Sequence, residues 1–415
     1  MVVYSCVDVR QFLTLKVDRL KWGNLWPICK YMGHPALKQA VPIFCLFFAG
    51  AFAMAAGAGP ATATKSGSAA SSSASKSSST STSTTHKHRK KSSGVSAYGD
   101  PTKDDNATYD DPLIRQIAVN ALGHANGSVL AMDPTTGRIL TIVNQKMAFS
   151  SGFEPCSTIK PVIALAGLQE GVITRDTMMR VGHRRYMDLT EAMAHSNNVY
   201  FEEVGTRLGF PRVHKYAHLL GLGQKAGYNI PEEQAGTLPS APPNYGGVAR
   251  MSSFGEGIRL TPLQLASLVS TLANGGTQYY LQYPRTEQER TAFQPKVKQE
   301  LDIAPLLPDL REGMLAAVMY GTAKQSYDPD EQALGKTGTC NDESLGGRLG
   351  WFVSYADEAH PRIVLVVLIR GGGRATSGPH ASEIAGRIYH GLRDRNYFAE
   401  STRKMRDAAT ARAAQ

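Results

Sequence analysis

The sequence predicts an α+β domain whose sheet is assembled from distant parts of the chain. Strand-like runs occupy residues 128–143 and 333–369, whereas apolar residues at helical spacing fill the region between them. Strands at both ends with helices between them are typical of this fold class. With 415 residues, of which 42% are hydrophobic and 19% charged, the chain can bury one large core or two modest ones.

The individual elements follow from their periodicity. A helix is predicted at residues 113–122, and next comes a hairpin whose turn contains Pro134 and Gly137. Strands and helices alternate with loops through the rest of the folded domain, which we place at residues 111–397. The expected strands are 128–132, 139–143, 333–340, 349–356 and 363–369, and the further helices are 161–170, 263–273, 310–318 and 381–392.

An apolar segment near the N-terminus predicts export. Residues 41–58 contain an uncharged apolar run that is short for a membrane span and fits the core of a signal peptide. Residues 1–40 carry the preceding cations and are expected in the cytoplasm, or are untranslated in part if synthesis starts at Met32. A cleaved signal peptide and an uncleaved anchor in the cytoplasmic membrane are both open. Either places the rest of the chain in the periplasm or at the outer face of that membrane.

Two segments flank the domain without the apolar periodicity that a core requires. Residues 59–110 are rich in Ser, Thr and Lys and are predicted to form a disordered tether, and residues 398–415 form a basic tail. Much of the net charge of +10 lies in these segments and the N-terminal one, which argues against nucleic acid as a partner. The basic run 86–91 can contact anionic wall polymers or lipid head groups, or remain solvated.

A serine and a lysine stand one helical turn apart at the start of a predicted helix. Ser157-Thr158-Ile159-Lys160 follows Pro155, and this spacing places the hydroxyl and the amine on one helix face. Serine becomes a nucleophile when a base takes its proton, and lysine can be that base once burial or a nearby cation lowers its pKa. The same spacing occurs in the tether at residues 73–76, so this motif alone is not specific.

Two further motifs follow along the chain, and each offers groups that acyl transfer can use. These are Ser196-Asn197-Asn198 and Lys336-Thr337-Gly338-Thr339, the second within a strand-like run. Ser196 can relay a proton between Lys160 and a leaving amine. Asn198 can bind an amide of the substrate.

The second motif can bind and polarise a substrate. Lys336 supplies positive charge beside the lysine base, and the hydroxyls of Thr337 and Thr339 can bind a carboxylate. Gly338 lets the substrate backbone approach the strand closely. The amides of Ser157 and Thr339 can form an oxyanion hole, and a helix N-terminus adds a favourable dipole there. No metal-ligand spacing or phosphate loop is visible, so we expect no metal and no cofactor.

The three motifs together resemble those of the serine β-lactamase and penicillin-binding superfamily. Residues 154–161 read EPCSTIKP and are similar to the E-P-G-S-T-x-K-P box of penicillin-binding protein transpeptidases. Residues 133–140 resemble the D-P-x-T-G-x-I-L hairpin of that family, and residues 255–266 its G-Q-G and T-P-L-Q-L-A stretch. Gly321-Thr322-Ala323 also fits, so the resemblance extends from near residue 111 to near residue 397.

The resemblance implies a fold and an activity. The fold is an antiparallel sheet covered by helices with an all-helical lobe beside it, and the nucleophile lies between them. The activity is that of a penicillin-binding acyl-serine transpeptidase, which cross-links peptidoglycan stem peptides and is acylated by β-lactam antibiotics. Because only the tether precedes the domain, the chain resembles a short monofunctional class B-like penicillin-binding protein, and a separate glycan polymerase is expected as its partner.

Other functions use the same residues. A DD-carboxypeptidase passes the acyl group to water and stays an alternative. A β-lactamase is disfavoured, because the class A signature E-x-x-L-N is missing and Ser196-Asn197-Asn198 departs from the S-x-V of class D. From a different class, the domain could be a non-catalytic β-lactam sensor or a division scaffold. The complete motif set argues against a scaffold, and residues 1–40 are short for a signalling domain.

Two cysteines depart from the family pattern. Cys156 replaces the Gly that usually precedes the nucleophile, and Cys340 follows Thr339, so each adjoins an oxyanion-hole amide. Some class A carbapenemases have a disulfide at equivalent positions, and the resemblance therefore implies a disulfide that braces the hole; the alternative is two small buried thiols. Little sequence separates Val143 from Phe153, which implies a more open groove or a differently built acceptor side.

Overall fold

The computed structural model describes residues 95–342, 346–356 and 362–398. The export segment 41–58, most of the predicted tether and the tail beyond Phe398 lie outside these residues, so what the sequence predicts for them stays a prediction. Within the described part of the chain, no helix is long and apolar enough to cross a membrane.

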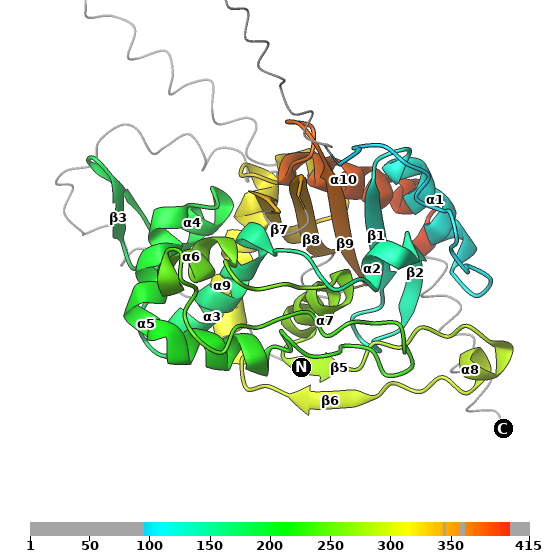
Figure 1. The fold of residues 1–415 in the computed structure, drawn as a ribbon, viewed down its shortest axis with the longest axis horizontal. Coiled ribbons are helices and arrows are strands. Elements are labelled where there is room, and N and C mark those ends of the chain that lie inside the picture. Colours follow the sequence, from blue (N-terminus) through cyan, green and yellow to red (C-terminus); the bar gives the residue numbers. More distant parts are fainter. Residues whose placement is uncertain (1–94, 343–345, 357–361, 399–415) are drawn as a thin grey trace, which may run out of the picture. The chain divides into compact units, whose positions relative to one another are not determined.

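An antiparallel sheet forms the centre of the domain. Its strands are β1 (Gly127–Met132), β2 (Ile139–Val143), β7 (Ala333–Asn341), β8 (Arg348–Ala356) and β9 (Ile363–Gly371). They are arranged in the order β2-β1-β9-β8-β7 (Figure 1). The predicted hairpin supplies β1 and β2, and β1 pairs along its other side with β9 near the end of the chain. The sheet is thus completed by segments far apart in sequence, and β7 lies at its edge.

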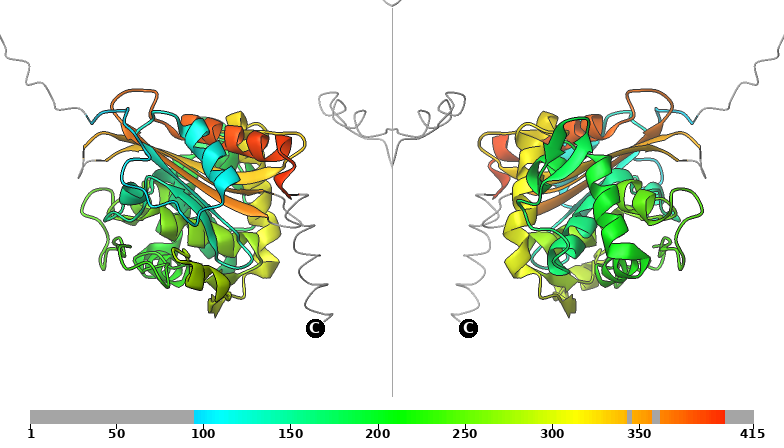
Figure 2. Two further views of the ribbon diagram at one scale, coloured as in Figure 1. Left: turned by 90° about the vertical axis from the view of Figure 1, so that its right-hand side faces the viewer. Right: turned by 90° about the vertical axis from the view of Figure 1, so that its left-hand side faces the viewer.

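Both faces of the sheet are covered. Helices α1 (Pro112–Leu122) and α10 (Gly378–Asp394) pack on one face, and α7 (Pro262–Ala273) packs on the other (Figure 2). Alternate side chains of each strand enter different cores, because successive residues of a strand point to opposite faces. On β9, for example, Leu365 and Val367 join the core beneath α1 and α10, whereas Val364 and Val366 join the core that contains α7.

A lobe of helices lies beside the sheet (Figure 1). It consists of η4 (Cys156–Ile159), α3 (Lys160–Gln169), α4 (Leu189–Ala194), α5 (Asn198–Leu219), α6 (Gly247–Phe254) and α9 (Leu307–Met319). The short 3-10 helix η4 packs against both β7 and α6, and α3 packs against α5 and α9. The start of α3 therefore lies where the helical lobe meets the edge of the sheet.

Smaller elements complete the described part of the chain. They are α2 (Gln145–Ala148), α8 (Glu287–Thr291), η5 (Ala304–Leu306), η6 (Lys324–Ser326), and two small hairpin-like sheets of β3 (Met179–Gly182) with β4 (Arg185–Met187) and β5 (Thr277–Tyr279) with β6 (Val297–Glu300). The α+β fold class is confirmed, as are the predicted strands and helices of the main sheet and its covering layers.

The folded part begins earlier than residue 111, where the sequence analysis placed it. The side chains of Asp105 and Asp110 are each only 2% exposed and pair with Arg115 of α1 at 2.8 and 3.0 Å. Asp110 also accepts hydrogen bonds from the hydroxyls of Tyr283 at 2.6 Å and Thr141 at 2.5 Å. The described end of the predicted tether is therefore held by buried carboxylates, which apolar periodicity does not reveal.

Candidate active site

The candidate nucleophile lies at the start of the α3 segment. Ser157 is in η4 and Lys160 begins α3, so the two side chains are about one turn apart, as the motif predicts. The Lys160 Nζ lies 2.8 Å from the Ser157 Oγ. Pro161 at the start of α3 suits this arrangement, because proline has no N–H to leave unpaired in a first helical turn. The pair is buried, with 7% of Ser157 and 0% of Lys160 exposed.

Four oxygen atoms surround the amine of Lys160. Besides the Ser157 hydroxyl, they are the carbonyl oxygen of Ser196 at 2.8 Å, the Ser196 Oγ at 3.1 Å and the Asn198 Oδ1 at 2.7 Å. An ammonium group has three hydrogens for these oxygens and cannot accept a bond. A neutral amine also offers a lone pair, which can accept the proton of the Ser157 hydroxyl.

The surroundings of Lys160 favour the neutral amine. Burial lowers the pKa of Lys160 well below its ordinary value, and repulsion from Lys336 lowers this pKa further, whereas Glu202 partly opposes the shift. The ring of Phe201 lies 5.6 Å from Nζ and closes one side of the amine's surroundings. The structure thus gives Lys160 the low pKa that a lysine base requires.

The second motif lies between α4 and α5. Ser196 has a φ of 54°, in the left-handed region, and this backbone turn brings its carbonyl and its hydroxyl to Lys160. Asn197 accepts a hydrogen bond from the backbone N–H of Tyr200 and so caps α5, which is a structural role. Asn198 places its Oδ1 on Lys160. Its Nδ2 is then the group that remains for the substrate amide that the sequence analysis assigned to it.

The third motif lies on the edge strand β7. The Lys336 Nζ donates to the Ser196 Oγ at 2.8 Å and to the Thr337 carbonyl at 3.0 Å. Ser196 therefore bridges the two lysines, since its hydroxyl lies within bonding distance of both amines. Burial lowers the pKa of Lys336 to about 7.

The two threonines of β7 have partners that the sequence did not indicate. The Thr337 hydroxyl lies 2.6 Å from that of Thr322, and the Thr339 hydroxyl accepts a hydrogen bond from the backbone N–H of Gly378 at 2.7 Å. Each hydroxyl can still make a further hydrogen bond, because a hydroxyl is one donor and two acceptors. Thr322 lies in the Gly321-Thr322-Ala323 segment, whose family resemblance was the only signal for it.

Gly338 allows β7 to touch the turn that carries the nucleophile. A Cβ at this position would lie 2.9 Å from the Pro155 carbonyl oxygen and 3.3 Å from the Cβ of Cys156, with Thr158 also close. Only glycine fits this contact without a shift of the strand or the turn. The contact is what brings the Ser157 and Thr339 segments side by side.

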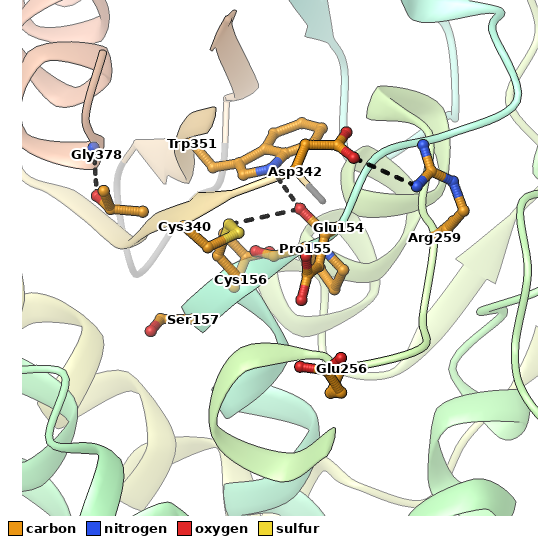
Figure 3. Close-up of a disulfide and its surroundings, with 12 residues drawn as sticks. Glu154, Pro155, Cys156, Ser157, Glu256, Arg259, Cys340, Asp342, Trp351 and Gly378 are labelled. Carbon is orange, nitrogen blue, oxygen red and sulfur yellow. Dashed lines mark hydrogen bonds and ion pairs between the residues drawn. A yellow bond between two sulfur atoms is a disulfide. The ribbon is translucent and has the colours of Figure 1, made fainter. Parts of the chain in front are cut away.

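A disulfide joins the same two segments. It links Cys156 and Cys340, whose Cα atoms are 5.6 Å apart, across a sequence separation of 184 residues. Figure 3 shows the bridge beside Ser157 and close to Glu154. Cys156 has a φ of 53°, a conformation that glycine adopts more easily than other residues. The turn is also held by Trp351 of β8, whose Nε1 donates to the Glu154 carbonyl at 2.9 Å.

Comparison with known proteins identifies this arrangement. The family model described as penicillin binding protein transpeptidase domain matches residues 127–390, which is well over half of the chain. The chain belongs to this family. All three motifs and both cysteines lie within the matched residues.

Curated relatives of this transpeptidase domain agree with the family match. Stage V sporulation protein D of Bacillus subtilis is 27% identical over 66% of this chain and 48% of its own length. Peptidoglycan D,D-transpeptidase MrdA of Haemophilus influenzae is 26% identical over 57% of this chain and 44% of its own. Penicillin-binding protein PbpB of Mycolicibacterium smegmatis is 26% identical over 68% and 52%. The chain spans about half the length of these relatives.

Some groups of the transpeptidase-like site were not anticipated from the sequence. Glu202 of α5 influences Lys160 electrostatically and accepts a hydrogen bond from Ser253 of α6 at 3.0 Å. The carbonyl of Ser253 in turn lies 3.5 Å from the Ser157 Oγ. Neither residue belongs to a motif, so only the folded arrangement reveals them. Among the described residues, no group of His, Cys, Asp and Glu side chains is placed to hold a metal ion.

Proposed function

We propose that this chain is a penicillin-binding D,D-transpeptidase that cross-links peptidoglycan stem peptides through an acyl-enzyme on Ser157. The observation that carries the proposal is the 2.8 Å contact between the Ser157 hydroxyl and a buried lysine whose pKa is depressed. A nucleophile paired with a base of lowered pKa is the arrangement that acyl transfer through serine requires. The names of the curated relatives support the same activity.

Acylation follows from the positions of the proposed catalytic groups. Lys160 takes the proton of Ser157 while the Oγ forms a bond with the carbonyl carbon of the penultimate D-alanine. The negative charge on the carbonyl oxygen is stabilised by the amides of Ser157 and Thr339. The bond to the terminal D-alanine then breaks, and its nitrogen receives the proton from Lys160 through the hydroxyl of Ser196, which lies 3.1 Å from Nζ.

Deacylation reverses these roles. The amine of an acceptor stem peptide attacks the ester carbon and gives a proton to Lys160 through Ser196. The ester bond breaks, an amide bond forms, and the Ser157 oxygen recovers its proton from Lys160. Water in place of the amine would give a carboxypeptidase.

Substrate binding is assigned to the neighbouring polar groups. Lys336 and the hydroxyls of Thr337 and Thr339 bind the terminal carboxylate, and the Asn198 amide binds the donor backbone. Gly338 leaves room along the strand for the donor. β-Lactam antibiotics present a carboxylate and a reactive amide in the same relative places, so they acylate Ser157. No cofactor takes part in these steps.

The cellular setting is part of the same proposal. Residues 41–58 export the chain or anchor it, and the catalytic domain acts on the outer side of the cytoplasmic membrane. A separate glycan polymerase supplies the strands that this domain cross-links.

The deciding experiment is acylation of the purified protein by a fluorescent penicillin, followed by intact mass over hours. A stable adduct on the parent chain, lost in Ser157→Ala, is expected. Rapid release of hydrolysed drug would identify a β-lactamase. An absence of any adduct would overturn the acyl-serine mechanism and favour a non-catalytic scaffold. Incubating the protein with donor and acceptor peptides then separates transfer to an amine from hydrolysis.

A further inference from the structure

A half-buried carboxylate near the lysine base belongs to none of the three motifs. Glu202 lies one helical turn after Asn198 on α5, so the two side chains share a face of that helix. Asn198 Oδ1 contacts the Lys160 amine at 2.7 Å, and the charge of Glu202 acts on the same amine. The face of α5 that carries Asn198 therefore also presents a negative charge to the site.

Glu202 also connects α5 to the nucleophile through α6. Its Oε1 accepts a hydrogen bond from the Ser253 Oγ at 3.0 Å, and the Ser253 carbonyl oxygen lies 3.5 Å from the Ser157 Oγ. The two helices approach closely at the neighbouring turn, where Gly205 leaves room for the side chain of Ser252. Because Ser253 is buried, its hydrogen bond to a carboxylate is a strong one, and it fixes the end of α6 beside Ser157.

Two opposite charges act on Lys160. Burial lowers the pKa of Lys160, repulsion from Lys336 lowers it further, and the Glu202 carboxylate raises it. The four oxygen atoms that contact the amine belong to neutral groups, and Glu202 forms no salt bridge within the described part of the chain. The neighbouring charges of α5 and α6 are paired with other residues: Glu203 with Arg207 at 2.8 Å, and Arg250 with Glu256 at 3.4 Å.

We propose that Glu202 is a positioning residue of the acylation step, which holds Ser253 against the nucleophile and stabilises the positive charge that Lys160 gains there. This inference rests on the proposed transpeptidase function. When the Ser157 Oγ forms its bond to the substrate carbonyl carbon, its proton moves to the Lys160 Nζ, and the lysine becomes an ammonium group. A carboxylate that acts without touching the amine favours this ammonium group, yet it does not form the direct ion pair that would keep Lys160 protonated beforehand.

The proposed role has different consequences at low and at high pH. Without the charge of Glu202, Lys160 loses its proton at a lower pH, so the rising part of the acylation profile moves to lower pH. The more weakly basic amine also takes the proton of Ser157 less readily, so the rate at higher pH falls. Burial sets the pKa of Lys336 at about 7, so the falling part of the profile should stay in place.

The test is acylation of the full chain by a fluorescent penicillin. The measured quantity is the second-order rate constant of Ser157 acylation, from about pH 5 to about pH 9. Glu202→Gln keeps a hydrogen-bond acceptor for Ser253 but removes the charge, whereas Ser253→Ala keeps the charge but removes the hydrogen bond. Glu203→Gln, which changes the adjacent exposed carboxylate on α5, is the matched control.

The variants should separate the charge from the hydrogen bond. At about pH 8, Glu202→Gln should be acylated on the order of tenfold more slowly than the parent, and this difference should shrink toward low pH. Glu202→Asp, which keeps the charge, should have a rising part closer to that of the parent. Ser253→Ala should be slower by a similar factor at every pH, because a hydrogen bond to a charged group is lost. Glu203→Gln should match the parent throughout.

The pH position of the profile separates the proposed role from structural damage. A loss of folded molecules lowers the rate equally at every pH and cannot move the rising part. A rising part that stays in place in Glu202→Gln would refute the inference, and so would an equal movement in Glu203→Gln. If Glu202→Gln does not fold, Ser253→Ala decides, since parent rates at every pH would then refute the positioning. A parent chain that is not acylated at any pH would instead refute the proposed function.

Discussion

The disulfide between Cys156 and Cys340 allows a prediction whose size follows from the structure. It closes a loop with a sequence separation of 184 residues. The loss of loop-closure entropy in the unfolded chain corresponds to a stabilisation of about 5 kcal/mol, and removal of native disulfides costs roughly 2 to 5 kcal/mol in practice. Replacing both cysteines by alanine should therefore lower the melting temperature by about 3 to 8 °C for a domain of about 300 residues.

Two comparisons make this prediction specific. The left-handed conformation of residue 156 costs alanine roughly 1 kcal/mol relative to glycine. The variant with Cys156→Gly and Cys340→Ala should therefore melt about 1 to 3 °C higher than the double alanine variant. Thermal unfolding with and without reductant supplies the other comparison, since the parent should be sensitive to reduction and neither variant should be. A parent that melts at the same temperature in both conditions, or a double alanine variant as stable as the oxidised parent, would refute the reasoning.

Three further predictions concern acylation and the domain boundary. Gly338→Ala should slow penicillin acylation by about a hundredfold to a thousandfold, because the added Cβ separates the two oxyanion-hole amides. Gly182→Ala, at an uncrowded glycine, is the control. Equal acylation rates for the two variants would contradict the contact. The kcat/KM for a donor with a terminal carboxylate should rise with pH as Lys160 loses its proton and becomes a base. It should fall above about pH 7, because Lys336 then loses the positive charge that binds the carboxylate. A kcat/KM that stays constant from about pH 6 to about pH 9 would contradict this prediction. Asp110→Ala should destabilise the domain by about 3 to 5 kcal/mol in urea unfolding, because Arg115 loses a buried partner. An unchanged midpoint of urea unfolding would instead support a folded domain that begins at residue 111.

The positions of most helices and strands could be predicted, because the periodicity of apolar residues determines them. The strands of the main sheet alternate between two cores, and α1 and α10 carry apolar stripes, so their positions follow from periodicity. Periodicity says nothing of which strands are neighbours, however. That β1 lies between β2 and β9 follows from packing over a long sequence distance, and the sequence analysis did not predict it.

The candidate site was predictable to the extent that its residues occur in motifs. Ser157, Lys160 and Lys336 lie in one site, as the set of three motifs predicted. Burial and the nearby Lys336 lower the pKa of Lys160, as expected for a lysine base. The partners supplied by tertiary structure could not be read from sequence. Glu202 and Ser253 are examples, because tertiary packing alone brings them beside Lys160 and Ser157.

The sheet order also determines when this protein can first react with its inhibitors. Ser157 and Lys160 are synthesised long before Thr339, and β7 and β8 gain their place in the sheet only when β9 joins β1. A chain that lacks its last strand therefore has the nucleophile without the second oxyanion-hole amide in position. We therefore expect covalent labelling by a fluorescent penicillin to report molecules whose sheet is complete, so the same reagent that reports catalysis could time the maturation of newly made chains.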